Sequence, residues 1–406
     1  MTSPVRITGY GIVTPLGNGL APFDDALLGA RSAVRAQALA LPGLDPMLLP
    51  VAPCTFDEAS VRAPSNLPLD RGTAMALSAA QSAVQAAGLD AADPERLGIF
   101  WGSGMGGSAS FDTTCEALYG QHRRLRPTTV LTTMPNAAAA ELALRHGARG
   151  AALTYACACA SSAVALGEAL RALRAGWIDV AIAGGHEAML TPGVLASWHA
   201  MRVLAPLREG MDAAAACRPF SEDRAGFALG EGAAAMVLET EAHAQARRAR
   251  SPLFLMGYAT NCDAMHITQP QAEGQARAMR AALRDAGLAP ADIGYINAHG
   301  TATRAGDAAE AQSVAEVFGS HTPVSSTKAI HGHLLGGGGA VEMVAVLRTL
   351  ERRCLPPTAH LAAADPAFAL DLVRGQAREA PQLRYALSNS FAFGGTNAVL
   401  IAGRHA

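Results

Sequence analysis

The stretch Leu153-Thr-Tyr-Ala-Cys-Ala-Cys-Ala-Ser-Ser-Ala163 runs from an apolar segment into a helical pattern, with a cysteine at the junction. After Ser161, apolar residues recur about one helical turn apart, and Gly176 stands where a C-terminal cap is expected. We therefore predict a buried strand that stops at the cysteine and leads directly into a helix.

The two cysteines of this stretch, Cys157 and Cys159, lie close to the expected helix N-terminus. Unpaired backbone N–H groups and the helix dipole favour a thiolate there, so we expect the pKa of the thiol to fall below its free value of about 8.5. The alternative is that both are small buried apolar residues, the commonest fate of free cysteine. The rest of the chain has to decide between a nucleophile and a core residue.

Composition favours an α/β protein. The chain has 406 residues, of which 50% are hydrophobic and 16% charged, and it contains 41 glycines. Such a chain is long enough for a large core with fully buried strands. A net charge of −2 gives no reason to expect nucleic acid or an anionic membrane as the main partner.

The seven cysteines are scattered without paired spacing, which argues against a disulfide framework and against a metal site. The first ten residues lack the charged and apolar regions of a signal peptide, and no uninterrupted apolar span reaches about 18 residues. We therefore expect a reducing, cytoplasmic location without membrane insertion.

Two segments roughly 200 residues apart share one pattern. Residues 81–104 and 280–300 each contain a helix closed by Gly-Leu, a short loop and a buried strand that ends at a glycine. So long an interval indicates two copies of one α/β unit rather than a solenoid, although chance similarity in an alanine-rich chain is the alternative. We divide the chain into halves at residues 1–245 and 246–406.

The spacing of apolar residues and the positions of turn-forming residues predict the remaining helices and strands. We expect strands over 5–13, 179–185, 323–328 and 385–401, helices over 21–28, 71–87 and 340–350, and irregular chain over 31–68. The ends of these strands collect reactive residues, as is typical of α/β proteins: Cys159, His299, Lys328, His333 and Phe393. Taken singly each has a structural explanation, since a lone histidine is more often a hydrogen-bonded core residue.

The order and combination of these motifs resemble those of the β-ketoacyl-acyl-carrier-protein synthases, the ketosynthase branch of the thiolase superfamily. The matching stretches cover nearly the whole chain: residues 11–17, 102–107, 156–162, 218–232, 263–270, 299–303, 326–333 and 389–397. The resemblance implies a thiolase-like, five-layered α-β-α-β-α fold built from two duplicated halves. It implies no bound cofactor, because phosphopantetheine is carried by the acyl-carrier-protein substrate.

The family's activity is a decarboxylative Claisen condensation, used in polyketide, aryl-polyene or fatty acid chain elongation. The nucleophile lies in an Ala-Cys-Ala-Ser stretch, which selects Cys159 and leaves Cys157 a structural residue of the strand. An acyl group transferred to this thiol needs an oxyanion hole, which the resemblance places at the backbone N–H groups of Cys159 and Phe393.

The second substrate is malonyl on the carrier protein, which loses carbon dioxide. The resemblance assigns His299 and His333 to the resulting enolate, whose oxygen two imidazole N–H groups can stabilise. Lys328 and Glu342 match a charge pair that orients His333.

The resemblance also suggests residues that contact the substrates. Phe393, Gly394 and Gly395 match a mobile gate. The substrate-binding candidates are Thr301 and Thr303 at the pantetheine arm, Met105 at the acyl tunnel entrance, Phe391, and Thr129, where elongating relatives often carry a large aromatic residue.

The implied partners are an acyl carrier protein and a second subunit, either an identical copy or a chain-length-factor-like subunit. Carrier proteins of this class are acidic, so we expect a basic rim at the tunnel mouth. The candidates are Arg202, Arg208 and the run Arg123-Arg124-Leu125-Arg126.

Two related functions compete with this one. A non-catalytic chain-length-factor-like subunit shares the fold but lacks the cysteine, and a coenzyme-A thiolase needs a second cysteine where this chain has Phe391-Ala-Phe393. Departures such as His331 in place of threonine and Ala392 in place of glycine point to a divergent branch, such as a secondary-metabolite synthase.

Overall fold

The computed structural model describes residues 3–41, 43, 45–90, 92–207 and 210–405. The strands in chain order are β1 Val5–Thr14, β2 Gly17–Asn18, β3 Arg35–Leu39, β4 Met47–Ala52, β5 Leu97–Gly102, β6 Ala152–Tyr155, β7 Val180–Glu187, β8 Leu229–Gly230, β9 Gly232–Glu239, β10 Leu253–Cys262, β11 Ile293–Asn297, β12 Pro323–Ser325, β13 Cys354–Leu355, β14 Asp371–Leu372, β15 Arg378–Glu379, β16 Tyr385–Phe391 and β17 Thr396–Arg404. The α-helices are α1 Leu20–Leu28, α2 Arg71–Ala87, α3 Ser108–Cys115, α4 Thr129–Thr133, α5 Ala137–His146, α6 Ser161–Arg174, α7 Pro192–Ala200, α8 Glu241–Ala246, α9 Ala272–Ala286, α10 Arg304–Phe318, α11 Lys328–His331 and α12 Leu335–Arg352.

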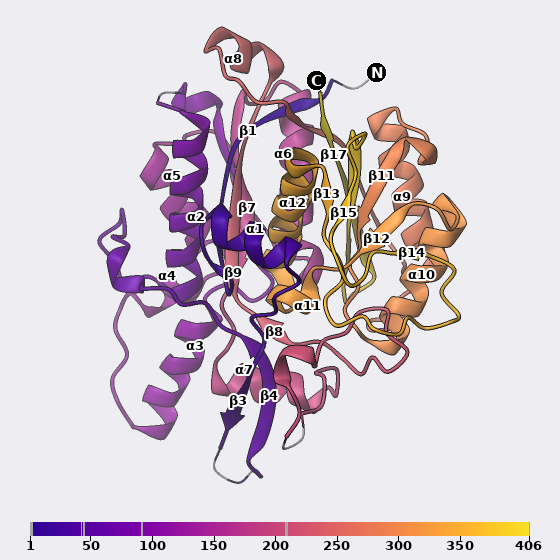
Figure 1. Cartoon of the computed structure of the whole chain (residues 1–406). Coiled ribbons are helices and arrows are strands. Elements are labelled where there is room, and N and C mark those ends of the chain that lie inside the picture. The colour runs from indigo at the N-terminus through magenta and orange to yellow at the C-terminus, as the bar shows by residue number, and fades with distance from the viewer. Residues whose placement is uncertain (1–2, 42, 44, 91, 208–209, 406) are drawn as a thin grey trace.

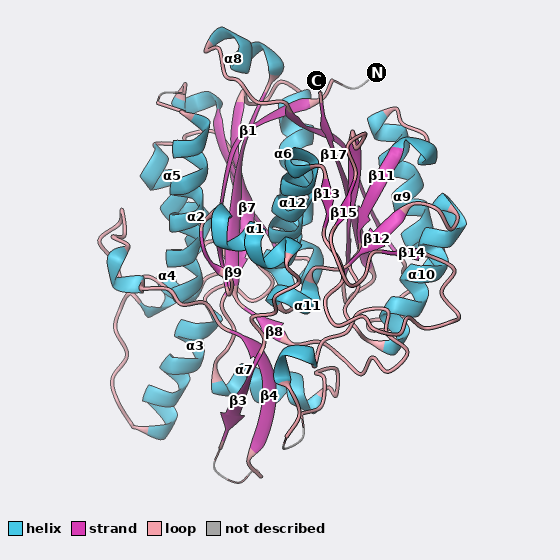
Figure 2. Cartoon of the chain, viewed as in Figure 1, coloured by secondary structure: helices cyan, strands magenta, loops and turns pink. Residues whose placement is uncertain are grey.

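In the described residues the main sheet has 12 strands, and their order repeats. Figure 2 shows strands such as β7 and β9 on one side of α12, and β11 and β12 on the other. One half reads β6-β5-β7-β9-β1 and the other β12-β11-β16-β17-β10, with β14 added at the outer edge of β12. In each half the second strand, β5 or β11, pairs parallel with both of its neighbours. The following two pairings in each half are antiparallel. This identical arrangement confirms two copies of one α/β unit.

The halves meet at a short antiparallel contact between β1 and β10, where Val5 pairs with Leu255 and Arg6 with Phe254. Helices α6 and α12 pack against each other between the two halves of the sheet (Figure 1). Helix α2 covers the outer face of the first half and α9 that of the second. The result is the five-layered α-β-α-β-α fold expected from the sequence.

Burial in the three inner layers, the two halves of the sheet and the helices between them, explains the apolar composition. Every residue of β7 and β9 is buried, and α12 is buried over almost its whole length, including Gly336 to Gly339. Elements enclosed on both faces need continuous apolar or small residues rather than an alternating pattern. No helix in the described part of the chain is long and apolar enough to cross a membrane.

Three local predictions were wrong. The strand before Cys159 is not buried: β6 lies at the edge of the sheet beside β5 alone, and Leu153 is 46% exposed. Residues 31–68 are not all irregular, because β3 and β4 form a hairpin that β8, far away in sequence, extends. Helix α12 begins at Leu335 instead of Ala340, since its glycines form the first turn rather than a loop.

Candidate active site

Cys159 lies in a single 3-10 turn, Ala158–Ala160, between β6 and α6. The hydroxyl of Ser161 holds this turn, because it accepts a hydrogen bond from the Cys157 N–H at 2.9 Å and donates one to the Ala158 carbonyl at 2.6 Å. Ala158 has a φ of 46°, which is costly for a residue with a Cβ atom. The turn places Cys159 at the start of α6. Cys157 is the residue just before the turn, after β6 has ended at Tyr155, and does not lie in the strand as predicted.

The fold brings two distant histidines to this cysteine. His299 follows β11 and His333 lies between α11 and α12. The Cys159 Sγ and His333 Nε2 atoms are 3.1 Å apart, and the two imidazole rings meet edge to face with centroids 5.3 Å apart. All three residues are buried.

Glu310 on α10 fixes the backbone of His299. Its carboxylate accepts the N–H groups of His299 and Gly300 at 2.8 and 2.7 Å, and the Asn389 amide at 3.0 Å. Asn389 belongs to β16, which continues into the Phe393 loop. Glu310 was missed from the sequence, although its spacing from Asp307 puts two acidic residues on one helical face, and both are buried.

Lys328 lies within hydrogen-bond distance of His299, whereas the sequence prediction paired it with His333. Its Nζ atom forms an ion pair with Glu342 Oε1 and lies 3.3 Å from His299 Nδ1. His333 Nδ1 has no hydrogen-bond partner within the described ranges. The reason for the difference is that the His333 ring points towards Cys159 and packs edge to face on Phe227.

Burial governs the protonation states of the site. It raises the pKa of Cys159 to about 12, although Lys328 and the Phe393 N–H act in the opposite direction. The predicted lowering of this pKa is therefore wrong. Burial, and then the nearby Lys328 charge, hold the pKa values of His299 and His333 well below the usual range, so both rings are neutral near pH 7.

The loop after β16 closes over the cysteine. The Phe393 N–H donates to the Cys159 sulfur, and the Phe393 ring stacks on Trp198 with centroids 6.2 Å apart. Gly394 and Gly395 have φ values of 87° and 78°, which glycine adopts without strain. The Gly394 N–H donates to the Ile267 carbonyl at 2.7 Å, which joins this loop to the segment after β10.

A cavity of about 310 Å³ contains most of the predicted residues. It is lined by Cys159, His299, His333, Thr301, Thr303, Phe391, Phe393 and Gly395, among others. Met201, 45% exposed, lines it as well, and the exposed Arg202 is its neighbour in sequence.

Other predicted residues lie elsewhere. Met105 lines a smaller cavity of about 230 Å³ with residues of α3 and α7, and Thr129 lines a third cavity together with Arg123, Arg124 and Arg126. Arg208 is outside the described residues.

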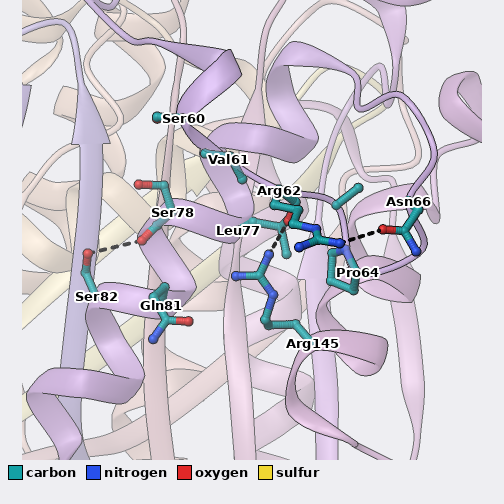
Figure 3. Close-up of a pocket in the computed structure, with 11 residues that line it drawn as sticks. Ser60, Val61, Arg62, Pro64, Asn66, Leu77, Ser78, Gln81, Ser82 and Arg145 are labelled. Atoms are coloured by element: carbon teal, nitrogen blue, oxygen red, sulfur yellow. Dashed lines mark hydrogen bonds between the residues drawn. The ribbon is translucent and has the colours of Figure 1, made fainter.

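A further cavity, of about 630 Å³, shares no residue with the Cys159 cavity. Figure 3 shows it between α2 and the loop over residues 60–66, with Arg145 reaching from α5 to the Arg62 carbonyl. Its lining residues include neither a cysteine nor a histidine, in contrast to those of the Cys159 cavity.

Comparisons with known proteins agree with this geometry. The family models of the beta-ketoacyl synthase N-terminal and C-terminal domains match residues 2–244 and 254–362. The 3-oxoacyl-[acyl-carrier-protein] synthase 2 of Staphylococcus aureus (strain N315) is 37% identical over 406 residues, which cover 98% of this chain and 97% of the relative.

Two solved structures share the whole fold. One is a type II polyketide synthase acyl-carrier protein in complex with its ketosynthase, with a TM-score of 0.90 and 27% identity. The other is the ishigamide ketosynthase/chain length factor, with a TM-score of 0.89 and 29% identity. Each comparison covers 100% of both chains.

Proposed function

The chain belongs to the β-ketoacyl synthase family of acyltransferases, which elongate acyl chains, and we propose that Cys159, His299 and His333 carry out its decarboxylative condensation. The observation that carries this proposal is the 3.1 Å contact between Cys159 Sγ and His333 Nε2, inside a cavity that His299 also lines. A thiol, two neutral imidazoles and a backbone N–H donor are the groups that this reaction requires.

In the first half-reaction, Cys159 takes the acyl group. Because burial keeps the thiol protonated, it needs a base, and His333 Nε2 accepts the proton as the sulfur attacks the thioester carbonyl. The Phe393 N–H, already directed at the sulfur, and the Cys159 N–H then stabilise the oxyanion. The carrier's thiolate leaves and takes the proton from His333.

In the second half-reaction, malonyl on the carrier loses carbon dioxide and its electron pair forms an enolate. The Nε2–H group of His299 donates a hydrogen bond to the enolate oxygen without adding a permanent charge. The neutral His333 ring, once its single proton has moved from Nδ1 to Nε2, donates a second one. The enolate carbon then attacks the acyl-Cys159 carbonyl. A new carbon–carbon bond forms, and Cys159 is released as the thiolate and regains a proton.

The rest of the cavity suits the substrate arms. Thr301 and Thr303 present hydroxyl groups 2.9 Å apart, which suit the amides of a pantetheine arm, and Phe391 adds an apolar wall with its ring 6.1 Å from His299. We assign the acyl chain to the side of α7, because this helix carries Trp198 against the Phe393 loop and also lines the Met105 cavity. The chain has no resident cofactor in this scheme, since phosphopantetheine arrives on the carrier protein.

We place the carrier protein at the mouth of the cavity, where Arg202 is exposed beside Met201. The exposed run from Arg123 to Arg126 is a second candidate contact. The substrate is acyl-carrier protein from polyketide, aryl-polyene or fatty acid elongation.

We also propose that a second subunit covers β6, either an identical copy or a chain-length-factor-like chain. The outer edge of β6 is unpaired in the described sheet, and an unpaired edge is a ready template for another strand. Phe111, Val130 and Leu131 on α3 and α4 are 53–64% exposed, which adds apolar surface for such an interface.

We further propose that each subunit consists of two halves, residues 1–245 and 246–406. We place the protein in the cytoplasm, where a nucleophilic thiol stays reduced.

Acyl loading tests the assignment of residues. After incubation with acyl-carrier protein, intact-mass spectrometry should show one acyl group on the wild type and on the matched control Cys157→Ala, and none on Cys159→Ala. Loading of His333→Ala should slow by about 10²–10⁴-fold because the buried thiol loses its base, whereas His299→Ala should load normally. An acyl group on Cys159→Ala would overturn the proposal.

A further inference from the structure

The three reactive side chains have the geometry of a metal site. The Cys159 sulfur and one nitrogen each of His299 and His333 lie within 4.8 Å of one another, and all three residues are buried. Thiolate and imidazole are the donors that Zn²⁺ prefers, and bond lengths of about 2.3 and 2.0 Å place tetrahedral ligands about 3.5 Å apart. A small rearrangement would therefore let a divalent ion occupy the cavity and block the nucleophile.

Lys328 controls whether His299 can be a ligand. An ammonium group has donors only, so at 3.3 Å it donates to His299 Nδ1, which must accept. The single proton of the neutral ring is then on Nε2, the nitrogen that does not contact Lys328. A protonated nitrogen has no lone pair to give to a metal.

If Lys328 were absent, Glu342 would favour metal binding by His299. Its Oε1 atom binds the same ammonium group as His299 Nδ1, so Lys328 separates a carboxylate from an imidazole. Without the lysine, the carboxylate would accept a hydrogen bond from Nδ1–H, which leaves the lone pair of Nε2 free for a metal. A carboxylate behind a histidine is the arrangement that strengthens metal-bound histidines. Loss of the Lys328 charge would also favour the binding of a metal cation at the triad.

We propose that Lys328 keeps the Cys159–His299–His333 triad free of divalent metal ions, because it fixes His299 as the Nε2–H tautomer and opposes a second cation. Lys328 is thus a positioning residue whose effect extends beyond the condensation itself. This inference depends on the geometry of the triad and not on the proposed reaction. The metal-binding experiment can therefore refute it without refuting the proposed function, and the acyl-loading experiment can refute the proposed function without refuting this inference.

Co²⁺ is a suitable probe, because tetrahedral Co²⁺ bound to a thiolate gives intense visible and near-ultraviolet absorption. Wild-type protein should show no such bands, and neither should Lys328→Arg, which retains a charged donor. Lys328→Met should bind one Co²⁺ or Zn²⁺ at least about tenfold more tightly than the wild type. The bands should vanish in the control Lys328→Met/Cys159→Ala.

Lys328→Met leaves a buried carboxylate without its partner, which could impair folding. Lys328→Met/Glu342→Gln avoids that charge, and an amide oxygen can still accept a hydrogen bond from His299 Nδ1–H, so this variant should bind the metal as well. The proposal is wrong if folded variants of both kinds bind metal no better than the wild type. It is also wrong if the wild type itself shows cobalt–thiolate bands that disappear in His299→Ala.

Discussion

Two effects compete at Cys159, and their sizes decide which one controls the thiol. A helix N-terminus stabilises a negative charge by about 0.3–1 kcal/mol, and by about 2 kcal/mol at most. Burial can shift a pKa by up to about 3–5 units, each worth about 1.4 kcal/mol. The 5% exposed Cys159 follows the larger effect and stays a thiol, which is why the proposed mechanism makes His333 its base.

The pH dependence of alkylation tests this conclusion. Because the pKa of Cys159 is raised to about 12, the thiolate fraction should keep increasing through pH 7–10. The rate of Cys159 alkylation by iodoacetamide, followed by peptide mass spectrometry, should rise about tenfold per pH unit without a plateau. The rate of alkylation of Cys262, which is exposed, is the internal control. A plateau of the Cys159 rate below pH 8 would show a lowered pKa instead.

Most of the reactive residues could be predicted from the sequence, because they stand at strand ends and in recognisable motifs. Cys159, His299, His333 and Phe393 do meet in one cavity. The partner of Lys328 and the role of Glu310 could not be predicted. Both depend on how α10 and α11 pack around the end of β11, and no local pattern encodes such a contact between distant segments.

At the scale of elements, the glycines of α12 explain how the two halves approach. A Cβ atom at Gly336 would lie 2.1 Å from the Gly104 nitrogen, whereas one at Gly338 would have only His333 Nδ1 near it, at 3.9 Å. Close packing therefore requires glycine at position 336. The structure shows no such need at Gly338.

These two positions form a matched pair. Gly336→Ala should destabilise the protein by about 1–3 kcal/mol through overpacking. Gly338→Ala should stabilise it by about 0.5–1 kcal/mol, because alanine loses less backbone entropy in a helix. Urea unfolding followed by circular dichroism would measure both changes. Equal effects at the two positions would contradict the packing described for α12.

The elements that the sequence mispredicted are those whose partners are distant. The β3–β4 hairpin depends on β8, some 180 residues later, and the exposure of β6 depends on its place at the edge of the sheet. Long helices such as α2, whose predicted bounds of 71–87 are those observed, carry their own apolar period and caps.

At the scale of the whole molecule, the repeated strand order brings the cysteine of one half and the histidines of the other to a common cavity. β6 leads to Cys159, while its counterpart β12 leads to α11 and His333. In the proposed mechanism, duplication therefore supplies two strand ends, one for the nucleophile and one for its base. Each half alone would lack part of the site.

The proposal that a second subunit covers the edge strand β6 can be tested with a substitution in that strand. Leu153→Arg places a charge on the exposed edge strand and should abolish the dimer without unfolding the subunit, because Leu153 is 46% exposed. Light scattering should then give a mass near 41.6 kDa. Trp177→Arg, at an exposed site beyond α6, should leave the dimer intact. An unchanged dimer with Leu153→Arg would place the interface elsewhere.

The central claim is that one cavity divides the chemistry between Cys159, which holds the acyl group, and His299, which supports decarboxylation. Single-turnover mass spectrometry of the acyl-loaded enzyme with malonyl-carrier protein tests it most directly. The wild type should release β-ketoacyl-carrier protein and return to its unmodified mass, while His299→Ala should keep its acyl group on Cys159 and leave malonyl intact. Product formed by His299→Ala at the wild-type rate would contradict the account.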